Sequence, residues 1–314
     1  MGIKFLNQFL RDKCNNSIAK INITDLTNKK IAVDISIYLY KYEATDTLLE
    51  NIYLMLSIFR HHNIIPVFIF DGKPPPEKNE LLKKRQEDKA AAKNEFNKLK
   101  EEMELNELSD EEKQEIIISM DQLKKQFVYM NHKKIEKVKE LIRAYGATYY
   151  DAPGEADELC ALLVNTNKVW ACLSEDMDLF VYGCKRVLRY ISLNNQTAVL
   201  YYTKGILKEL NMNQKEFREI CVLSGTDYNI NVNVLNLFDI INLFYKFQQG
   251  LPNQPFYDWL NLDLDLDLLK KINSMFDISN ELTNSFKNIQ ILNGPIQKNL
   301  IKEIMKEDGF LFLD

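Results

Sequence analysis

Two groups of acidic residues lie close together between residues 149 and 182. Glu155, Asp157 and Glu158 begin a helical run, and Asp176 and Asp178 follow an apolar strand. Carboxylates that come together repel one another unless a positive charge neutralises them. Because these side chains offer only oxygen ligands, the fitting counter-charge is a hard divalent cation such as Mg2+ or Mn2+. The spacing therefore predicts a metal site formed by carboxylates.

The first seventy residues predict a strand–helix–strand unit that adds two acids to this set. A buried strand ends at Asp34, an amphipathic helix covers residues 48–59, and a second strand, residues 64–70, is followed by Asp71. Two strands joined in this way are parallel, with a right-handed crossover. Because α/β sheets place their sites at the carboxyl ends of such strands, we expect both acids to belong to the same site.

Composition excludes several other classes of protein and site. The chain has 314 residues, 46% of them hydrophobic, which fits one large or two modest globular domains. No apolar run reaches the ~18 residues that a membrane span needs. Five scattered cysteines without a C-x-x-C pair indicate reduced thiols in an intracellular protein, and three histidines are too few for a His-rich zinc site. We therefore expect no membrane role, and carboxylates remain as the metal chemistry.

The net charge of −5 hides two basic segments. Residues 73–100 contain nine basic and five acidic side chains, and residues 124–143 contain seven basic and two acidic ones. Between them, residues 101–112 carry seven acids and no base. Clustered lysines and arginines contact phosphates and make nucleic-acid affinity depend on salt. The two basic segments are therefore expected to contact a polyanion.

A long charged helical insertion interrupts the α/β pattern. The periodicity predicts helices over residues 77–105, 111–127 and 131–145, with a polar break at 106–110. So many polar and charged residues cannot form a core, and we expect the insertion to project from the body.

After the insertion the α/β alternation resumes and then gives way to helices. Residues 147–150 predict a strand, and residues 187–191 and 198–202 predict a hairpin. The chain beyond residue 229 is expected to be helical. Residues 262–267 alternate Leu and Asp, which predicts a strand or an acidic loop. Because neighbours in a strand point to opposite faces, these acids are not expected to bind a metal.

Six short motifs occur in order along the first part of the chain. They are M-G-I-K at the start, A-V-D-I-S, V-F-I-F-D-G-K-P-P, A-P-G-E-A-D, S-E-D-M-D and L-S-G-T-D-Y. Any one of them is a weak signal, but together, across about residues 1–228, they resemble the flap endonuclease and XPG-type family of structure-specific nucleases.

The resemblance implies an α/β fold with a mainly parallel central sheet and helices on both faces, a PIN-like nuclease core. The core would span residues 1–228, with a helical arch over the active site inserted at about 73–132. A helical C-terminal region, residues 229–314, would pack on the core and could hold variant duplex-binding helices.

The resemblance also implies a reaction. It is the Mg2+-dependent hydrolysis of DNA phosphodiesters at single-strand/double-strand junctions with a free 5′ end. The protein would act as a flap endonuclease and 5′–3′ exonuclease in replication, repair or recombination, on DNA with a 5′ flap, nick or branched junction. Two Mg2+ ions, which Mn2+ could replace, would activate a water and stabilise the leaving oxygen. The first ion would be held by Asp34, Asp71, Glu155 and Asp157, and the second by Asp176, Asp178 and Asp227.

The same resemblance assigns roles to residues outside the acidic set. Lys78 and Arg85 match bases that approach the scissile phosphate, and their separation of two helical turns lets both face the site. Tyr40 matches an aromatic that stacks on a base, and Gly2 belongs to the N-terminal strand of the active site. The residues expected to bind substrate are Gly2, Tyr40, Lys83 and Lys84.

The chain departs from the family pattern at three places. Asp157 stands where the family has Glu, and Glu158 is a better i, i+3 partner for Glu155, so either acid could be the ligand. Residues 229–235 contain no glycine, whereas the family has a glycine-containing hairpin there that grips duplex DNA and K+. Residues 309–314 lack the sliding-clamp motif and are expected to pack as an apolar tail.

Other functions stay open on the sequence alone. One is a non-catalytic branched-DNA-binding recombination protein, and another is a junction resolvase or RNase of the same fold. A phosphatase is a remote alternative, because Asp176 and Asp178 have Asp-x-Asp spacing but the other five acids would be unexplained. We expect a monomer that is located in the nucleus or at another site of DNA replication. If the protein comes from a virus that replicates in the cytoplasm, that site is the cytoplasm.

Overall fold

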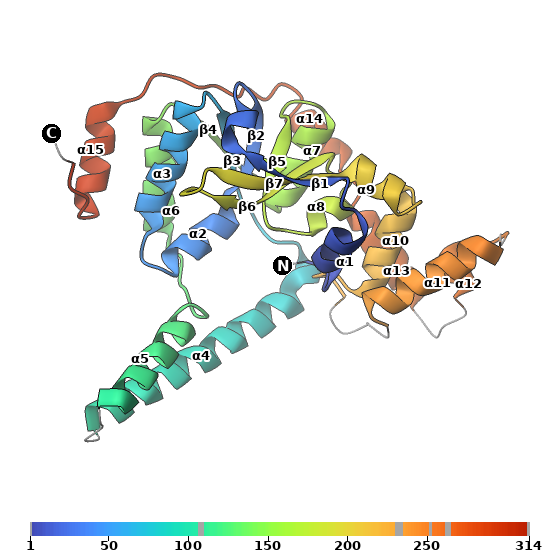
Figure 1. Cartoon of the computed structure of the whole chain (residues 1–314), viewed down its shortest axis with the longest axis horizontal. Coiled ribbons are helices and arrows are strands. Elements are labelled where there is room, and N and C mark those ends of the chain that lie inside the picture. Colours follow the sequence, from blue (N-terminus) through green and yellow to red (C-terminus); the bar gives the residue numbers. More distant parts are fainter. Residues whose placement is uncertain (1, 106–109, 230–234, 251–252, 261–264, 313–314) are drawn as a thin grey trace.

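A mixed sheet forms the centre of the fold (Figure 1). The computed structural model describes residues 2–105, 110–229, 235–250, 253–260 and 265–312. Within these residues the sheet has seven strands in the order β1-β7-β6-β5-β2-β3-β4. The strands are β1 Ile18–Asn22, β2 Lys30–Asp34, β3 Ile65–Phe70, β4 Thr148–Asp151, β5 Ala171–Leu173, β6 Arg186–Ser192 and β7 Thr197–Tyr202.

Strands β4, β3, β2, β5 and β6 run parallel to one another, and β7 and β1 add antiparallel pairs beyond β6. The expected mainly parallel sheet is therefore confirmed, as is the hairpin formed by β6 and β7. Strand β1 was not predicted, because Ile18 and Ile21 are only half-buried and their neighbours are exposed. Its partner β7 lies almost 180 residues away in the chain, so no local pattern indicates the pairing.

Helices cover both faces of the sheet, as expected. Side chains of the central strands alternate between the two layers: Ala32 and Cys172 face one, and Val33 and Leu173 face the other. The first layer contains α1 Leu6–Lys13, α7 Ala156–Asn165, α8 Asp178–Val181, α9 Thr203–Glu209 and α10 Gln214–Ser224. The second contains η1 Ile23–Leu26, α2 Ile35–Glu43, α3 Leu48–His61, α6 His132–Ala144 and α15 Lys298–Glu307.

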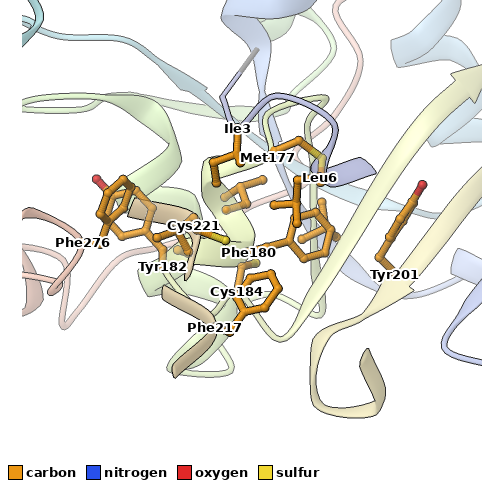
Figure 2. Close-up of a cluster of buried hydrophobic side chains, with 14 of the residues drawn as sticks. Ile3, Leu6, Met177, Phe180, Tyr182, Cys184, Tyr201, Phe217, Cys221 and Phe276 are labelled. Carbon is orange, nitrogen blue, oxygen red and sulfur yellow. The ribbon is translucent and has the colours of Figure 1, made fainter. Parts of the chain in front are cut away.

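A hydrophobic cluster anchors the N-terminal segment to the loop that carries two of the acids (Figure 2). Ile3 and Leu6 come from the start of the chain, Met177 is the N-cap residue of α8, and Phe180 lies within that helix. Phe217 of α10 belongs to the same cluster, and all five of these side chains are almost completely buried. The burial of several apolar side chains fixes the backbone on which Asp176 and Asp178 lie.

The charged insertion forms an antiparallel pair of helices that projects from the body (Figure 1). A short η2 turn, Pro76–Lys78, leads into α4, Asn79–Leu105, and α5, Asp110–Lys124, returns along it. The rings of Phe96 and Phe127 pack edge to face at 5.4 Å where the two segments meet. Most of the predicted polar break, residues 106–109, lies outside the described residues.

The C-terminal region first packs on α10 and then runs back across the sheet. Its helices are α11 Leu237–Gly250, α12 Phe256–Trp259, α13 Leu266–Met275 and α14 Asn280–Ser285. The following strap, residues 289–297, hydrogen-bonds the edge formed by β4 and the end of α6, and leads into α15. Phe310 and Phe312 then pack around Tyr53, with ring centroids 5.7 and 5.9 Å away.

The Leu/Asp repeat does not form the predicted strand where the structure describes it. The Asp265 side chain accepts a hydrogen bond from Leu268 N and caps α13, which includes Leu266 and Asp267. The helix forms because Asp265 caps its first turn and the apolar residues that follow recur at helical spacing. These two signals outweigh the alternation of Leu and Asp that predicts a strand. Residues 262–264, like residues 230–234 of the glycine-free segment, lie outside the described residues.

Candidate active site

The parallel strands bring acids from distant parts of the sequence to one edge of the sheet. Asp34 is the last residue of β2, and Asp71 directly follows β3, its parallel neighbour. Asp176 lies in the loop after β5, the other parallel neighbour of β2. Because parallel strands share one carboxyl edge, the charges of Asp71 and Asp176 both act on Asp34.

Asp34 is buried at this edge and accepts a hydrogen bond from one side chain of the described residues. The hydroxyl of Ser174 donates a hydrogen bond to Asp34 Oδ2 over 2.7 Å. Burial, followed by the charge of Asp71, raises the pKa of Asp34 to about 8. Both causes disfavour the ionised form, so this carboxyl attracts a proton or a cation.

The loop after β5 aims two acids at the start of the chain. Ser174 Oγ accepts a bond from Asp176 N, and Asp176 Oδ1 accepts one from Asp178 N. Gly2 has φ +73°, and a Cβ atom added there would lie 2.5 Å from Asp178 Oδ1 and 2.9 Å from Asp176 Oδ1. The backbone at Gly2 thus lies directly against these carboxylates, where only glycine fits.

The N-terminus of α7 contributes Glu155 and Asp157. Glu155 is the N-cap residue, and Asp71 Oδ1 accepts a hydrogen bond from the next backbone N–H, that of Ala156, over 2.8 Å. Asp157 is 7% exposed, and burial followed by the charge of Glu155 raises the pKa of its carboxyl well above the usual range. A helix N-terminus favours these carboxylates through its free N–H groups.

The structure separates Asp157 from Glu158, the two acids that the sequence left open as ligands. The carboxyl of Asp157 interacts with those of Asp176 and Asp178. Glu158 Oε1 instead accepts a hydrogen bond from Ser279 N, 3.2 Å away, at the start of α14. The geometry therefore favours Asp157 as the member of the acidic site and makes Glu158 a contact to the C-terminal region.

Two bases from the start of the insertion reach into the acidic site. Lys78 Nζ lies 2.6 Å from Glu155 Oε1 and 3.7 Å from Asp227 Oδ2. Arg85 Nη2 lies 3.0 Å from Asp227 Oδ2. Burial lowers the pKa of the Lys78 amine, but Glu155, Asp157 and Asp178 raise it by more, so the pKa is above its ordinary value. Lys78 therefore stays charged among the carboxylates.

The other expected substrate residues lie around this site with different exposure. Tyr40 on α2 is 46% exposed, and the ammonium of Lys89 lies 5.1 Å from its ring centroid. Burial, followed by the charge of Asp71, raises the pKa of Tyr40, which places its hydroxyl near the acids. Lys83 and Lys84 are exposed on the first turns of α4.

The second basic segment is less free than the sequence predicts. Lys124, Lys134, Lys137 and Lys139 form ion pairs with Asp46, Glu43, Glu307 and Asp151, respectively. Their positive charge is already partly balanced within the protein. The expectation that this whole segment contacts phosphates is therefore weakened by the structure.

The donor set fits hard divalent cations. Every candidate ligand is a carboxylate, and both oxygens of Asp178 are buried without a hydrogen-bond partner. Among the described residues, no three acidic, histidine or cysteine side chains converge on one point as they stand. Lys78 and Arg85 contact Glu155 and Asp227 instead. Binding an ion would thus require these side chains to reorient.

Sequence reasoning missed Tyr228. Its hydroxyl donates to Glu155 Oε2 over 2.6 Å, and Lys78 Nζ lies 4.9 Å from its ring centroid. The same ring packs on Phe276 of the C-terminal region, so this tyrosine links that region to the site. In the sequence, only its position next to Asp227 indicates that Tyr228 could belong to the site.

A buried arginine donates a hydrogen bond to the backbone of the acidic loop, and sequence reasoning did not identify it. Arg189 on β6 is 5% exposed and donates to the carbonyl of Glu175, the residue before Asp176, over 2.9 Å. Its guanidinium also donates to Asn7 Oδ1 on α1, over 2.5 Å. It therefore ties the N-terminal helix to the loop, and nothing in the local pattern of an apolar strand indicates that role.

Comparison with known sequences and structures identifies similar proteins. The sequence pattern described as the XPG N-terminal domain matches residues 1–92, and that of the XPG I-region matches residues 146–227. Flap endonuclease 1 of Bos taurus is 29% identical over 265 residues, which cover 78% of this chain and 66% of that protein, just under two thirds. A probable RAD2-like endonuclease of Invertebrate iridescent virus 6 is 27% identical over 283 residues, covering 74% of this chain and 68% of that protein.

Solved structures share the fold. The catalytic core of Rad2 in complex with a DNA substrate aligns with a TM-score of 0.68 at 19% identity, covering 95% of this chain and 94% of that one. Flap endonuclease-1 from Methanococcus jannaschii aligns with a TM-score of 0.59 at 20% identity, covering 98% of both chains. Human GEN1 in complex with Holliday junction DNA aligns with a TM-score of 0.62 at 19% identity, covering 98% of this chain and 73% of that one.

Proposed function

Because the chain belongs to the XPG-type family of structure-specific nucleases, we propose that it is a metal-dependent 5′ nuclease. It would hydrolyse DNA phosphodiesters at junctions between single and double strands, as a flap endonuclease and 5′–3′ exonuclease. One observation carries this proposal: acids from three strand ends and a helix N-terminus lie near one another, beside two bases, at a single edge of the sheet.

The seven acids are the proposed metal ligands. Bound Mg2+, which Mn2+ could replace, would supply an activated water and charge stabilisation of the leaving oxygen. The unpartnered oxygens of Asp178 and the raised pKa of Asp34 both support a site that lacks positive charge. One ion would be held by Asp34, Asp71, Glu155 and Asp157, and the other by Asp176, Asp178 and Asp227.

The bases and the N-terminal segment would act on the DNA itself. Lys78 and Arg85 would contact the scissile phosphate and stabilise the charge that develops on its oxygens. For this they must exchange their present carboxylate partners for the phosphate. The backbone at Gly2, pressed against Asp176 and Asp178, would limit the space at the acids and so help to orient the strand.

The exposed residues near the site would bind the rest of the strand. The ring of Tyr40, close to Asp71 but open to solvent, can stack on a base, a contact worth about 1–3 kcal/mol. Lys83 and Lys84 would contact neighbouring phosphates, which makes affinity depend on salt. These contacts bind substrate without taking part in bond breaking.

Resolution of four-way junctions is the second candidate function. It is favoured by the alignment of almost the whole chain with GEN1, which was solved with Holliday junction DNA. A non-catalytic branched-DNA-binding protein would explain the glycine-free segment 229–235 but not the convergence of the acids. We place the protein inside the cell as a monomer at a site of DNA replication or repair.

A cleavage panel tests the proposal. Purified protein should cut a labelled 5′-flapped duplex when Mg2+ or Mn2+ is added and leave it intact in a chelator. Asp176→Ala should lower turnover at least about a thousandfold while circular dichroism shows an unchanged fold. Preference for a four-way junction over a flap would favour the resolvase. Full turnover without Asp176 would refute the assignment.

A further inference from the structure

A second basic surface lies at the opposite edge of the sheet from the acids. Here the amino ends of β2, β5 and β6 lie side by side, since Ile31 pairs with Ala171 and Cys172 with Val187. Six basic residues and two aromatic rings gather at this edge, which we call the amino-edge face. They are Lys29, Lys30, Lys168, Lys185, Arg186 and Lys204, with Trp170 and Tyr202.

The contacts of Trp170 show that the face is continuous. Its backbone N–H donates to the carbonyl of Lys30, and its carbonyl accepts from Arg186 Nη1. The ammonium of Lys29 lies 4.7 Å and the guanidinium of Arg186 lies 5.2 Å from its ring. Arg186 also approaches the exposed ring of Tyr202, at 6.0 Å. One half-buried indole thus holds two cations at the centre of the face.

The remaining lysines extend the face on the α7 side and the β7 side. Lys185 Nζ donates to the carbonyl of Asn165, at the end of α7, and to Asn167 Oδ1, the residue before Lys168. The carbonyl of Lys185 accepts from the backbone N–H of Thr203, the residue before Lys204. Lys30, Lys168, Lys185 and Lys204 are all exposed to solvent.

The positive charge of this face is not balanced by the protein. Within the described ranges, none of the six basic side chains forms an ion pair, in contrast to Lys124, Lys134, Lys137 and Lys139. The acid next to the face, Asp25, accepts from Lys29 through its backbone carbonyl, and its carboxylate accepts from the backbone N–H of Asn22 instead. In a chain with net charge −5, six unpaired cations on one edge indicate an anionic partner.

We propose that the amino-edge face binds the phosphate backbone of a nucleic-acid segment other than the one at the acids. Six lysine and arginine side chains spread over neighbouring strand ends suit a run of phosphates rather than one small anion. The strands between the two edges are five or so residues long, about 15 Å, so one phosphate cannot contact both. The face would therefore hold a second arm of a branched DNA or a second duplex.

Trp170 offers a direct probe of this face. The only other tryptophan, Trp259, lies on α12, so the Trp259→Phe variant leaves Trp170 as the sole indole. Adding a short DNA duplex in a chelating buffer should change the emission of Trp170, because phosphates would draw Lys29 and Arg186 away from its ring. The effect should disappear at high salt.

The test variant removes charge from three exposed lysines whose side chains make no hydrogen bond or ion pair with the described part of the chain, by the changes Lys30→Gln, Lys168→Gln and Lys204→Gln. We expect the affinity of the face for duplex DNA to fall at least about tenfold. The slope of log affinity against log salt concentration should become shallower by up to about 2.7, which is about 0.9 for each lost phosphate contact. The matched control changes three exposed lysines of the C-terminal region, Lys287, Lys298 and Lys306, to Gln, and should leave both quantities unchanged.

The outcomes separate this proposal from the proposed nuclease activity. Binding is read without metal, so a protein that never cuts DNA can still show the emission change and support the face. Cleavage of a short flap substrate should be equal in the triple variant and its control, because neither touches the acidic site. An emission change that persists in the triple variant, or that anionic phosphatidylserine vesicles cause while duplex DNA does not, would overturn the proposal.

Discussion

Single carboxyl groups at the acidic edge have a raised affinity for protons. Asp34 has a pKa of about 8 because it is buried and lies near Asp71 and Asp176. Asp157 and Asp178 are raised in pKa for the same reason, burial first and neighbouring acids second. These carboxyls therefore bind protons more tightly than free carboxyls do, and metal binding should release protons.

The first prediction concerns the stability of the metal-free protein. The folded pKa of Asp34 is raised above its ordinary 3.8, so the folded state binds the proton more tightly than the unfolded state. Its contribution to stability is present below about pH 4 and is lost as pH rises towards about 8. The free energy of unfolding, measured in a chelator, should fall between about pH 4 and pH 8. The Asp34→Asn variant should show a smaller fall over the same pH range. An equally steep slope in the variant would contradict the shift.

The second prediction concerns the hydroxyl of Tyr228. Tyr228→Phe removes the hydrogen bond to Glu155 but keeps the ring on Lys78 and Phe276. Groups that orient metal ligands usually contribute about tenfold or more to metal affinity. Calorimetric titration with Mg2+ should show that loss.

Tyr257→Phe is the control for this variant. It also removes one hydroxyl, which donates to the carbonyl of Glu219 over 3.1 Å and accepts from Asn273 Nδ2 over 3.4 Å, both outside the site. The control should bind Mg2+ as the unchanged protein does. Equal affinities in all three proteins would show that the Tyr228 hydroxyl does not orient Glu155.

At the scale of elements, α4 connects the projecting insertion to the chemistry of the body. The helix begins at Asn79, directly after η2, whose last residue, Lys78, contacts the acids. The first two turns of α4 bring Arg85 to the same acids, while Lys83 and Lys84 stay exposed. Only the first turns of α4 face the body, and the rest of the helix projects from it (Figure 1). This explains why the insertion is polar and only weakly amphipathic.

The third prediction separates the two faces of α4. Arg85→Ala removes a cation at the site and should lower kcat about a hundredfold, because charge stabilisation of that size is typical of a preorganised donor. Lys84→Ala, one residue away on the exposed side, should instead weaken substrate binding and its salt dependence, with kcat unchanged. Single-turnover cleavage at several salt concentrations distinguishes the two. Equal losses of kcat would show that α4 does not orient these side chains as described.

At the scale of the whole molecule, the C-terminal strap closes the sheet edge opposite β1. Gly294 N donates to the carbonyl of Gly146, and Gln297 N donates to that of Ala144, so the strap satisfies backbone groups at the end of α6. Arg60 also donates to the carbonyl of Gly294. These contacts protect an edge of the sheet that would otherwise expose unpaired backbone groups.

The fourth prediction tests that closure. Gly146 has φ +72°, and a Cβ atom added there would lie 2.5 Å from the backbone of Gly294, so Gly146→Ala should destabilise the protein by about 1–3 kcal/mol. Gly154→Ala is the matched control, because a Cβ atom there meets nothing within 4 Å. Thermal unfolding should show a lower Tm for the first variant only. A Tm equal to that of the control would mean that the strap does not rest on Gly146.

The sequence by itself determined the framework and the chemistry of the candidate site. Continuous apolar runs predict buried parallel strands, and the position of Asp34, Asp71 and Asp176 at or after their ends places all three at one edge. The polar composition likewise determined that the insertion would project as helices. These features follow from local periodicity and from the handedness of crossovers, both of which can be read along the chain.

Only the tertiary structure decided which neighbouring side chain faces the site. It turned Asp157 towards the acids and Glu158 towards Ser279, and it placed Arg189 behind the acidic loop. It also paired β1 with β7 and brought Lys78 to Glu155, 77 residues away. Such contacts depend on packing between elements distant in sequence, where a rotation of a helix by one residue exchanges its partners, and no local pattern encodes that rotation.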